Sequence, residues 1–231
     1  MDDLNCWQSK FEFCPYSDKL ISKIILLNKQ TDNKVDLNEV KKAIYYAKKY
    51  HAEQKRNSGE PYYTHPIIVA TMVVNFCFKT DILVTSILHD LLEDTNIKKE
   101  QIKYIFSSKI AENVENLTRI KPDGKITSSK IVELLWIQNK HELLLIKFFD
   151  RIHNMQTLEA KSLEKQEKIT LETLRYFLPL VAFYSLFDLE KEFGDLCYKI
   201  RSKHFEPEHI THHFDLEENY QILSQVSQNI K

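Results

Sequence analysis

The chain has 231 residues, which suits one large domain or one domain with an appendage. Hydrophobic residues make up 43% of it and charged residues 28%, values typical of a soluble globular protein. Its formal net charge of −1 provides no general attraction for nucleic acid or for an anionic membrane, so we expect neither as a partner.

The start of the chain and its cysteines indicate the compartment. Met1-Asp2-Asp3 is acidic, unlike the basic start of a signal peptide, and no apolar stretch is long enough to span a bilayer. The 4 Cys have neither metal-site spacing nor the arrangement of a disulfide framework, which favours free thiols in a reducing compartment. We therefore expect a cytoplasmic protein.

Helices dominate the expected fold. The chain contains only 3 Gly and 6 Pro, and no segment alternates apolar and polar residues for long. We expect an all-α fold of roughly eight to eleven helices. Residues 1–35 would form a helical preamble, residues 36–203 the main domain and residues 204–231 a C-terminal helical tail.

Caps and apolar periodicity place the expected helices. Asp36 can cap one helix, with Glu39 reaching back to it, and Asp81 can cap another that carries His89 and Asp90. The other main helices are expected at residues 66–78, 98–106, 108–119, 129–139, 141–158, 165–184, 187–202 and 216–229.

The most informative local feature is the pair His89-Asp90, set in an apolar run and followed at once by Glu93 and Asp94. A buried helix has little use for four ionisable groups, because each loses its hydration and needs a partner. A bound cation would satisfy an imidazole and a neighbouring carboxylate together. In an unbroken helix, Glu93 lies four residues after His89, and Asp94 lies four after Asp90, so both acids can face that cation.

Two further segments supply polar residues at unexpected places. His65 closes a loop at residues 53–65, and Asp150 ends a strongly apolar run. Asn154 and Thr157 follow Asp150 by four and seven residues, which puts all three on one helical face.

Considered singly, these residues have ordinary explanations, such as a helix cap for His65 or an ion pair between Asp150 and Arg151. In combination, His65, His89, Asp90 and Asp150 offer two imidazoles and two carboxylates. That mixed set suits Mn²⁺, Fe²⁺ or Zn²⁺ and leaves coordination positions for water and a phosphate oxygen.

The order His65, His89-Asp90, Asp150 resembles the HD-domain metal-dependent phosphohydrolases. Three segments narrow the resemblance to the RelA/SpoT-type (p)ppGpp hydrolases: RNSGEPYYTHP at 56–66, LHDLLEDT at 88–95 and IKFFDRIHNMQTL at 146–158. The resemblance covers about residues 43–200 and implies the helical bundle of HD domains.

The resemblance also implies a role for each residue. One Mn²⁺ ion would be held by His65, His89, Asp90 and Asp150. The attacking water would be oriented and deprotonated by Glu93 and Asp94. The base, the ribose and the 3′-diphosphate would be bound by Arg56, Asn154 and Thr157. The implied reaction turns a small-molecule nucleotide, ppGpp or pppGpp, into GDP or GTP and pyrophosphate, and so degrades the stringent-response alarmone.

The chain departs from the family pattern at Ile131-Val132-Glu133, at Lys140-His141-Glu142 and at Gln156. It has no segment resembling a synthetase domain, so we expect a stand-alone hydrolase. The departures keep two alternatives open. One is an HD phosphohydrolase for another nucleotide, such as NADPH at its 2′-phosphate. The other is a weakly active regulatory module that binds (p)ppGpp.

Overall fold

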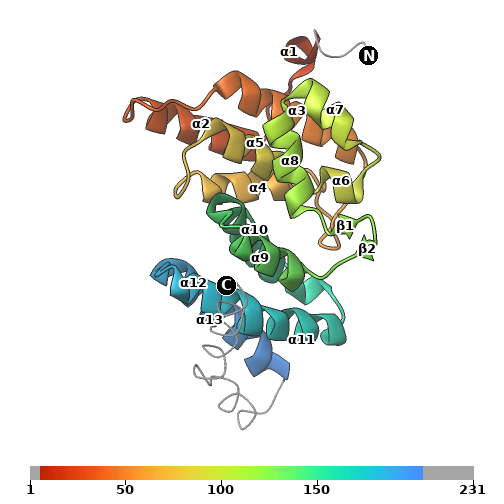
Figure 1. The fold of residues 1–231 in the computed structure, drawn as a ribbon, viewed down its shortest axis with the longest axis vertical. Coiled ribbons are helices and arrows are strands. Elements are labelled where there is room, and N and C mark those ends of the chain that lie inside the picture. Colours follow the sequence, from red (N-terminus) through yellow and green to blue (C-terminus); the bar gives the residue numbers. More distant parts are fainter. Residues whose placement is uncertain (1–5, 205–231) are drawn as a thin grey trace.

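The computed structural model describes residues 6–204, which fold almost entirely as helices (Figure 1). The first helices in chain order are α1 (Trp7–Lys10), α2 (Pro15–Asn28), α3 (Leu37–His51), α4 (Thr64–Val73), α5 (Thr80–Leu88), α6 (Leu91–Asp94), α7 (Lys99–Ile105) and α8 (Ser108–Leu117). A short hairpin follows, made of β1 (Ile120–Lys121) and β2 (Gly124–Lys125).

The remaining elements are helical. They are α9 (Ser128–Ile137), α10 (His141–Gln156), a 3₁₀ turn (Leu158–Ala160), α11 (Leu163–Glu172), a π-helical turn (Thr173–Phe177), α12 (Leu178–Phe183) and α13 (Phe187–His204). The all-α prediction is confirmed. The helix expected at 216–229 lies outside the described residues, and the domain boundaries at 35/36 and 203/204 stay predictions.

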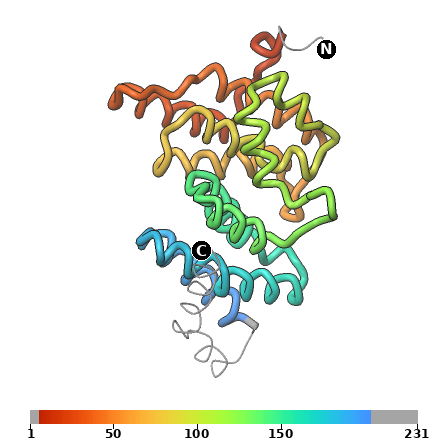
Figure 2. The backbone as a smooth tube through the Cα atoms, viewed as in Figure 1, coloured from red at the N-terminus to blue at the C-terminus, as the bar shows by residue number. Residues whose placement is uncertain are grey.

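The helices form three levels with α10 in the middle (Figure 1). Helices α2 to α8 lie above it, α9 lies beside it, and α11 to α13 lie below it. The chain passes from the upper to the lower level once, through the hairpin, α9 and α10 (Figure 2). Helix α10 packs against α4 and α5 on one side and against α13 on the other, so its residues are among the most buried.

One hydrophobic core runs through all three levels. In the lower half, Phe148 of α10, Phe177 of the π-helical turn and Phe193 of α13 are fully buried. Their ring centroids are 6.4 Å apart for the first pair and 6.2 Å for the second. This aromatic contact fixes α11 to α13 against the helix that carries Asp150.

The cap predicted at the start of α3 is confirmed only in part. Asp36 Oδ1 accepts a hydrogen bond from the backbone N–H of Asn38 at 2.8 Å. Glu39 does not return the contact: the backbone N–H of Asp36 donates to Thr80 Oγ1 at 2.9 Å, and Glu39 pairs with Lys42 instead. The long-range bond ties α3 to the start of α5.

Three of the expected helices differ from the prediction in ways that have a physical reason. Helix α4 ends at Val73, and the N–H groups of Asn75 and Phe76 then bond three residues back and tighten the turn. Helix α5 begins at Thr80, so Asp81 lies in its first turn rather than at its cap and pairs with Lys109. The helix expected at 165–184 is widened at the π-helical turn, where the Leu178 N–H bonds to the carbonyl of Thr173, five residues back.

The segment 89–90 interrupts the helix that was expected to carry both His89 and Asp94. Helix α5 ends at Leu88 and α6 begins at Leu91, which leaves His89 and Asp90 at their junction.

Within residues 6–204, no helix combines the length and the apolar composition that a membrane-spanning segment needs. All four cysteines are free thiols, as expected.

Candidate functional site

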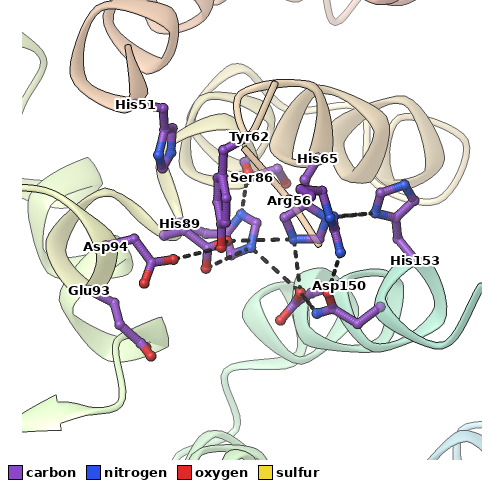
Figure 3. Close-up of polar contacts among 12 residues, drawn as sticks. His51, Arg56, Tyr62, His65, Ser86, His89, Glu93, Asp94, Asp150 and His153 are labelled. Atoms are coloured by element: carbon purple, nitrogen blue, oxygen red, sulfur yellow. Dashed lines mark hydrogen bonds and ion pairs between the residues drawn. The ribbon is translucent and has the colours of Figure 1, made fainter. Parts of the chain in front are cut away.

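Three separate parts of the fold bring the predicted ligands together. His65 lies in the first turn of α4, His89 and Asp90 join α5 to α6, and Asp150 lies in α10 (Figure 3). The exposed fraction is 2% for His65, 2% for His89 and 7% for Asp150. One donor atom from each of these three residues lies within 4.8 Å of the other two. We call His65, His89, Asp90 and Asp150 the buried cluster.

In the buried cluster, two imidazole nitrogens face two carboxylates. His65 Nε2 is 3.1 Å from Asp150 Oδ1 and 3.5 Å from Asp90 Oδ2. His89 Nε2 is 3.1 Å from Asp90 Oδ1 and 3.8 Å from Asp150 Oδ1. Such a set of nitrogen and oxygen donors suits a first-row divalent cation.

The hydrogen bonding of His89 fits a metal ligand. Its Nδ1 is 2.7 Å from the carbonyl oxygen of Ser86, and because a carbonyl only accepts, Nδ1 donates. Its Nε2 is buried and has no hydrogen-bond partner among the described residues. An imidazole that donates through one nitrogen and presents the other to carboxylates is arranged as metal-binding histidines are. The cluster therefore fits a bound divalent cation.

The negative charges of Asp90 and Asp150 also favour a bound cation. Burial opposes the charged form of His89, but Asp90 and Asp150 outweigh it and raise the pKa of His89 to about 10. Burial likewise opposes ionisation of Asp150, yet Lys147 and the two histidines hold its pKa well below the usual range. Both carboxylates thus remain ionised and attract positive charge into a buried space.

Asp150 is held on both of its oxygens. Lys147, one turn earlier and itself buried, pairs with Oδ2, and Asn154 Nδ2 donates to Oδ1 at 2.6 Å. The ordinary alternative, an ion pair with Arg151, does not form, because Arg151 bonds to Glu172 at 2.6 Å. Asp150 Oδ1 is left facing the two histidines.

Asp94 is connected to the cluster through Tyr62. The Tyr62 hydroxyl is 2.6 Å from Asp94 Oδ2 and 3.2 Å from Asp90 Oδ2. The ring of His51 stacks on Tyr62 at a centroid distance of 4.7 Å, and Gln54 donates to the backbone carbonyl of Asp94. Burial, and then the charge of Asp90, raises the pKa of Asp94. Asp94 is therefore a stronger base than an exposed aspartate.

Glu93 is tied to the hairpin region rather than to the cluster. Arg119 donates through Nε to Glu93 Oε1 at 2.9 Å and also through Nη2, and Lys125 Nζ lies 2.9 Å from the same oxygen. These cations outweigh the effect of burial and lower the pKa of Glu93. The prediction that Glu93 faces the cluster assumed an unbroken helix from His89 to Glu93. In the structure α5 ends at Leu88 and a new helix, α6, begins at Leu91.

The residues predicted to bind substrate meet in a cavity of about 150 Å³, lined by Lys55, Arg56, Asn57, Ser58, Tyr62, Asn154, Thr157 and Lys161. Arg56 Nη2 donates to Asn154 Oδ1 at 2.8 Å and to Thr157 Oγ1 at 3.2 Å. Arg56 Nη1 lies 3.0 Å from Nδ1 of His153. These bonds lie at the edge of the guanidinium and do not involve its flat faces.

The residues of the site that were missed from the sequence include Tyr62, Arg119, Lys147 and His153. Two of them carried a signal, because Lys147 and His153 lie three residues before and after Asp150 on the same helical face. Tyr62 approaches from the loop before α4 and Arg119 from the bend between α8 and β1, where periodicity gives no information.

Known proteins resemble this chain in sequence and in fold. A family model described as HD domain matches residues 43–183. A Brucella ovis protein named GTP pyrophosphokinase rsh is 34% identical over 175 residues, which cover 72% of this chain and 23% of that protein. An Aquifex aeolicus protein named guanosine-3′,5′-bis(diphosphate) 3′-pyrophosphohydrolase is 34% identical over 167 residues, with coverage of 70% and 24%.

The chain spans about a quarter of the length of these curated relatives. Among solved structures, one described as a metazoan ortholog of SpoT that hydrolyses ppGpp has a TM-score of 0.60 and 19% identity. The match covers 73% of this chain and 98% of that one, and at this identity it supports the fold. Since the family model covers more than half of the residues and the fold agrees, the chain belongs to the HD domain family.

Proposed function

We propose that this protein is a metal-dependent 3′-pyrophosphohydrolase of (p)ppGpp that uses one Mn²⁺ ion. The observation that carries the proposal is the meeting of two histidines and two aspartates beside a cavity that contains Arg56. The substrate is supported by the relatives: the Aquifex protein is named for this hydrolysis, and the metazoan protein is described as hydrolysing ppGpp.

The ion would be held by His65, His89, Asp90 and Asp150, whose donor atoms already converge. Bound there, a divalent cation supplies a Lewis acid, which makes water easier to deprotonate and offsets the charge of phosphate oxygens. Lys147 and Asn154 keep Asp150 in place, and Ser86 keeps His89 in place.

Asp94 is the better proton acceptor of the two neighbouring acids. Its pKa is raised by burial and by Asp90, whereas that of Glu93 is lowered by Arg119 and Lys125. A base whose pKa lies closer to neutrality accepts a proton from water more effectively. We assign proton removal to Asp94. Glu93 is assigned to the orientation of the water and to holding Arg119 and Lys125 in place.

The cavity provides the contacts for the nucleotide. Arg56 is anchored through its edge by Asn154 and Thr157, so a face of its planar guanidinium suits stacking on a purine. Asn154 and Thr157 are assigned to the ribose and the 3′-diphosphate, next to Asp150.

The atoms of the reaction balance with water as the only co-reactant. The water oxygen bonds to the phosphorus attached to O3′ of the nucleotide, and the O3′–P bond breaks. The proton taken by Asp94 is matched by the proton that the released 3′ oxygen takes up. The products are GDP or GTP and pyrophosphate.

The test is pyrophosphate release from ppGpp in the presence of Mn²⁺. Asp90→Asn removes a charge from the cluster and is expected to lower the rate at least about a hundredfold. Asp195→Asn, at an exposed position of α13, is the matched control and is expected to retain the wild-type rate.

No turnover of ppGpp by the wild-type chain, in an assay where a known hydrolase is active, would contradict the proposal. Release of inorganic phosphate from NADPH, with no release of pyrophosphate from ppGpp, would favour the alternative of an HD phosphohydrolase for another nucleotide.

A further inference from the structure

His153 lies behind one of the proposed ligands, where no role has been assigned to it. It follows Asp150 by three residues on α10 and is only 5% exposed. Its Nδ1 is 2.6 Å from Nδ1 of His65 and 3.0 Å from Nη1 of Arg56 (Figure 3). It therefore bridges the cavity and the buried cluster.

The two imidazoles meet through a hydrogen bond between their edges. Their ring centroids are 4.8 Å apart while the two Nδ1 atoms are 2.6 Å apart, so these nitrogens are the nearest parts of the two rings. A bond between two Nδ1 atoms needs one donor and one acceptor. Only one of the two nitrogens carries the shared proton.

Arg56 decides which nitrogen carries it. A guanidinium has N–H donors and no acceptor, so a neighbour within hydrogen-bond distance of Arg56 Nη1 must present a lone pair. The Nδ1 of His153 is thus an acceptor. The opposing nitrogen, Nδ1 of His65, must then be the donor.

The consequence reaches the other side of the His65 ring. A neutral imidazole with its proton on Nδ1 has a lone pair on Nε2. His65 Nε2 lies 3.1 Å from Asp150 Oδ1 and 3.5 Å from Asp90 Oδ2. Because a carboxylate only accepts, Nε2 donates to Asp150, and the proposed cation would replace that proton while Nδ1 keeps its own. The opposite tautomer would set an N–H of His153 against the N–H donors of Arg56.

His89 reaches the same arrangement by a simpler route. Its Nδ1 donates to the backbone carbonyl of Ser86, which leaves Nε2 to face the carboxylates. For His65 the acceptor is a side chain whose own tautomer depends on Arg56. The protonation of His65, unlike that of His89, therefore depends on Arg56, the residue proposed to bind the nucleotide.

We propose that His153, held as an acceptor by Arg56, is a positioning residue that fixes the tautomer of His65 for coordination through Nε2. The proposal rests on the metal site of the proposed function but not on the identity of the substrate. It links the cavity to the metal site through two consecutive hydrogen bonds.

The direct test is nitrogen NMR of the metal-free, full-length chain with labelled histidine rings, with His65 assigned by its absence in His65→Gln. The expected spectrum shows His65 protonated on Nδ1. Arg56→Gln can donate or accept, so it is expected to give a mixture of His65 forms with and without a proton on Nδ1. A wild-type His65 that lacks a proton on Nδ1 would overturn the proposal.

A second test measures Mn²⁺ affinity by calorimetry without nucleotide. His153→Phe removes the acceptor and is expected to weaken binding about 10- to 100-fold. His153→Asn places an amide oxygen near the position of Nδ1 and is expected to stay within about threefold of the wild type. His141→Phe, which removes an imidazole bonded to Tyr184 away from the cluster, is the control and is expected to change nothing.

Equal affinity of His153→Phe and the wild type would overturn the proposal. Both measurements are made without ppGpp, so a failure of the proposed hydrolysis would leave their outcome unaffected.

Discussion

At the scale of single residues, a cation that binds to His89 must displace a proton from its ring. Asp90 and Asp150 raise its pKa to about 10 despite burial, so the metal-free imidazole is doubly protonated at neutral pH. A ligand must present an unprotonated Nε2. Below about pH 10, Mn²⁺ binding is therefore expected to release about one proton per ion, with an affinity that rises about tenfold per pH unit.

Calorimetry in two buffers of different ionisation enthalpy measures this proton release. At neutral pH the apparent binding enthalpy is expected to differ between the two buffers by about one proton's worth of their difference in ionisation enthalpy per ion bound. Equal enthalpies in both buffers at neutral pH would show that His89 is already unprotonated.

The predicted ligands could be found from the sequence because each is a polar residue in or beside an apolar segment. Lys147 and His153, three residues from Asp150 on the same helical face, also carried a signal, but the contacts between distant parts of the chain could not be found in this way. The bond from Tyr62 to Asp94 joins positions 32 apart, and the bond from His65 to His153 joins positions 88 apart. Such contacts depend on how α4, α6 and α10 pack, which local periodicity does not determine.

At the scale of elements, the helix expected at 165–184 shows both the strength and the limit of sequence patterns. Its extent was predicted closely, but the widened turn at 173–177 was not. In that turn the Leu178 N–H bonds to the carbonyl of Thr173, five residues back. The turn places Phe177 in the core between Phe148 and Phe193, a tertiary demand that local propensity does not reveal.

Phe177→Ala is expected to lower the free energy of unfolding by about 3–5 kcal/mol, because it leaves a cavity at the contact between α10, the π-helical turn and α13. Urea denaturation followed by circular dichroism measures the change. The neighbouring Tyr176 is 36% exposed, and Tyr176→Ala is the matched control with an expected loss below about 1 kcal/mol. Similar losses for the two variants would show that Phe177 does not anchor this contact.

At the scale of the whole molecule, the buried cluster joins parts of the chain that are far apart in sequence. His65 comes from α4, His89 and Asp90 from the α5–α6 junction, and Asp150 from α10, the helix between the upper and lower levels (Figure 1). A cation bound by all three parts stabilises the folded chain, since the unfolded chain does not preserve the cluster.

Mn²⁺ at about 100 times its dissociation constant is expected to stabilise the fold by about 2.7 kcal/mol, which corresponds to a rise in Tm of about 5–10 °C. Thermal unfolding with and without Mn²⁺ measures the shift. Asp90→Asn is expected to lose most of it and the control Asp195→Asn to keep it. An equal shift in Asp90→Asn would place the stabilising ion elsewhere.

Phosphorus NMR identifies the products after ppGpp is incubated with the chain and Mn²⁺ and the metal is then removed by a chelator, and so tests the proposed hydrolysis itself. GDP and pyrophosphate are expected in equal amounts, formed only when the cation is present and not by Asp90→Asn. Inorganic phosphate as the product, or ppGpp that remains intact beside an active reference hydrolase, would contradict it.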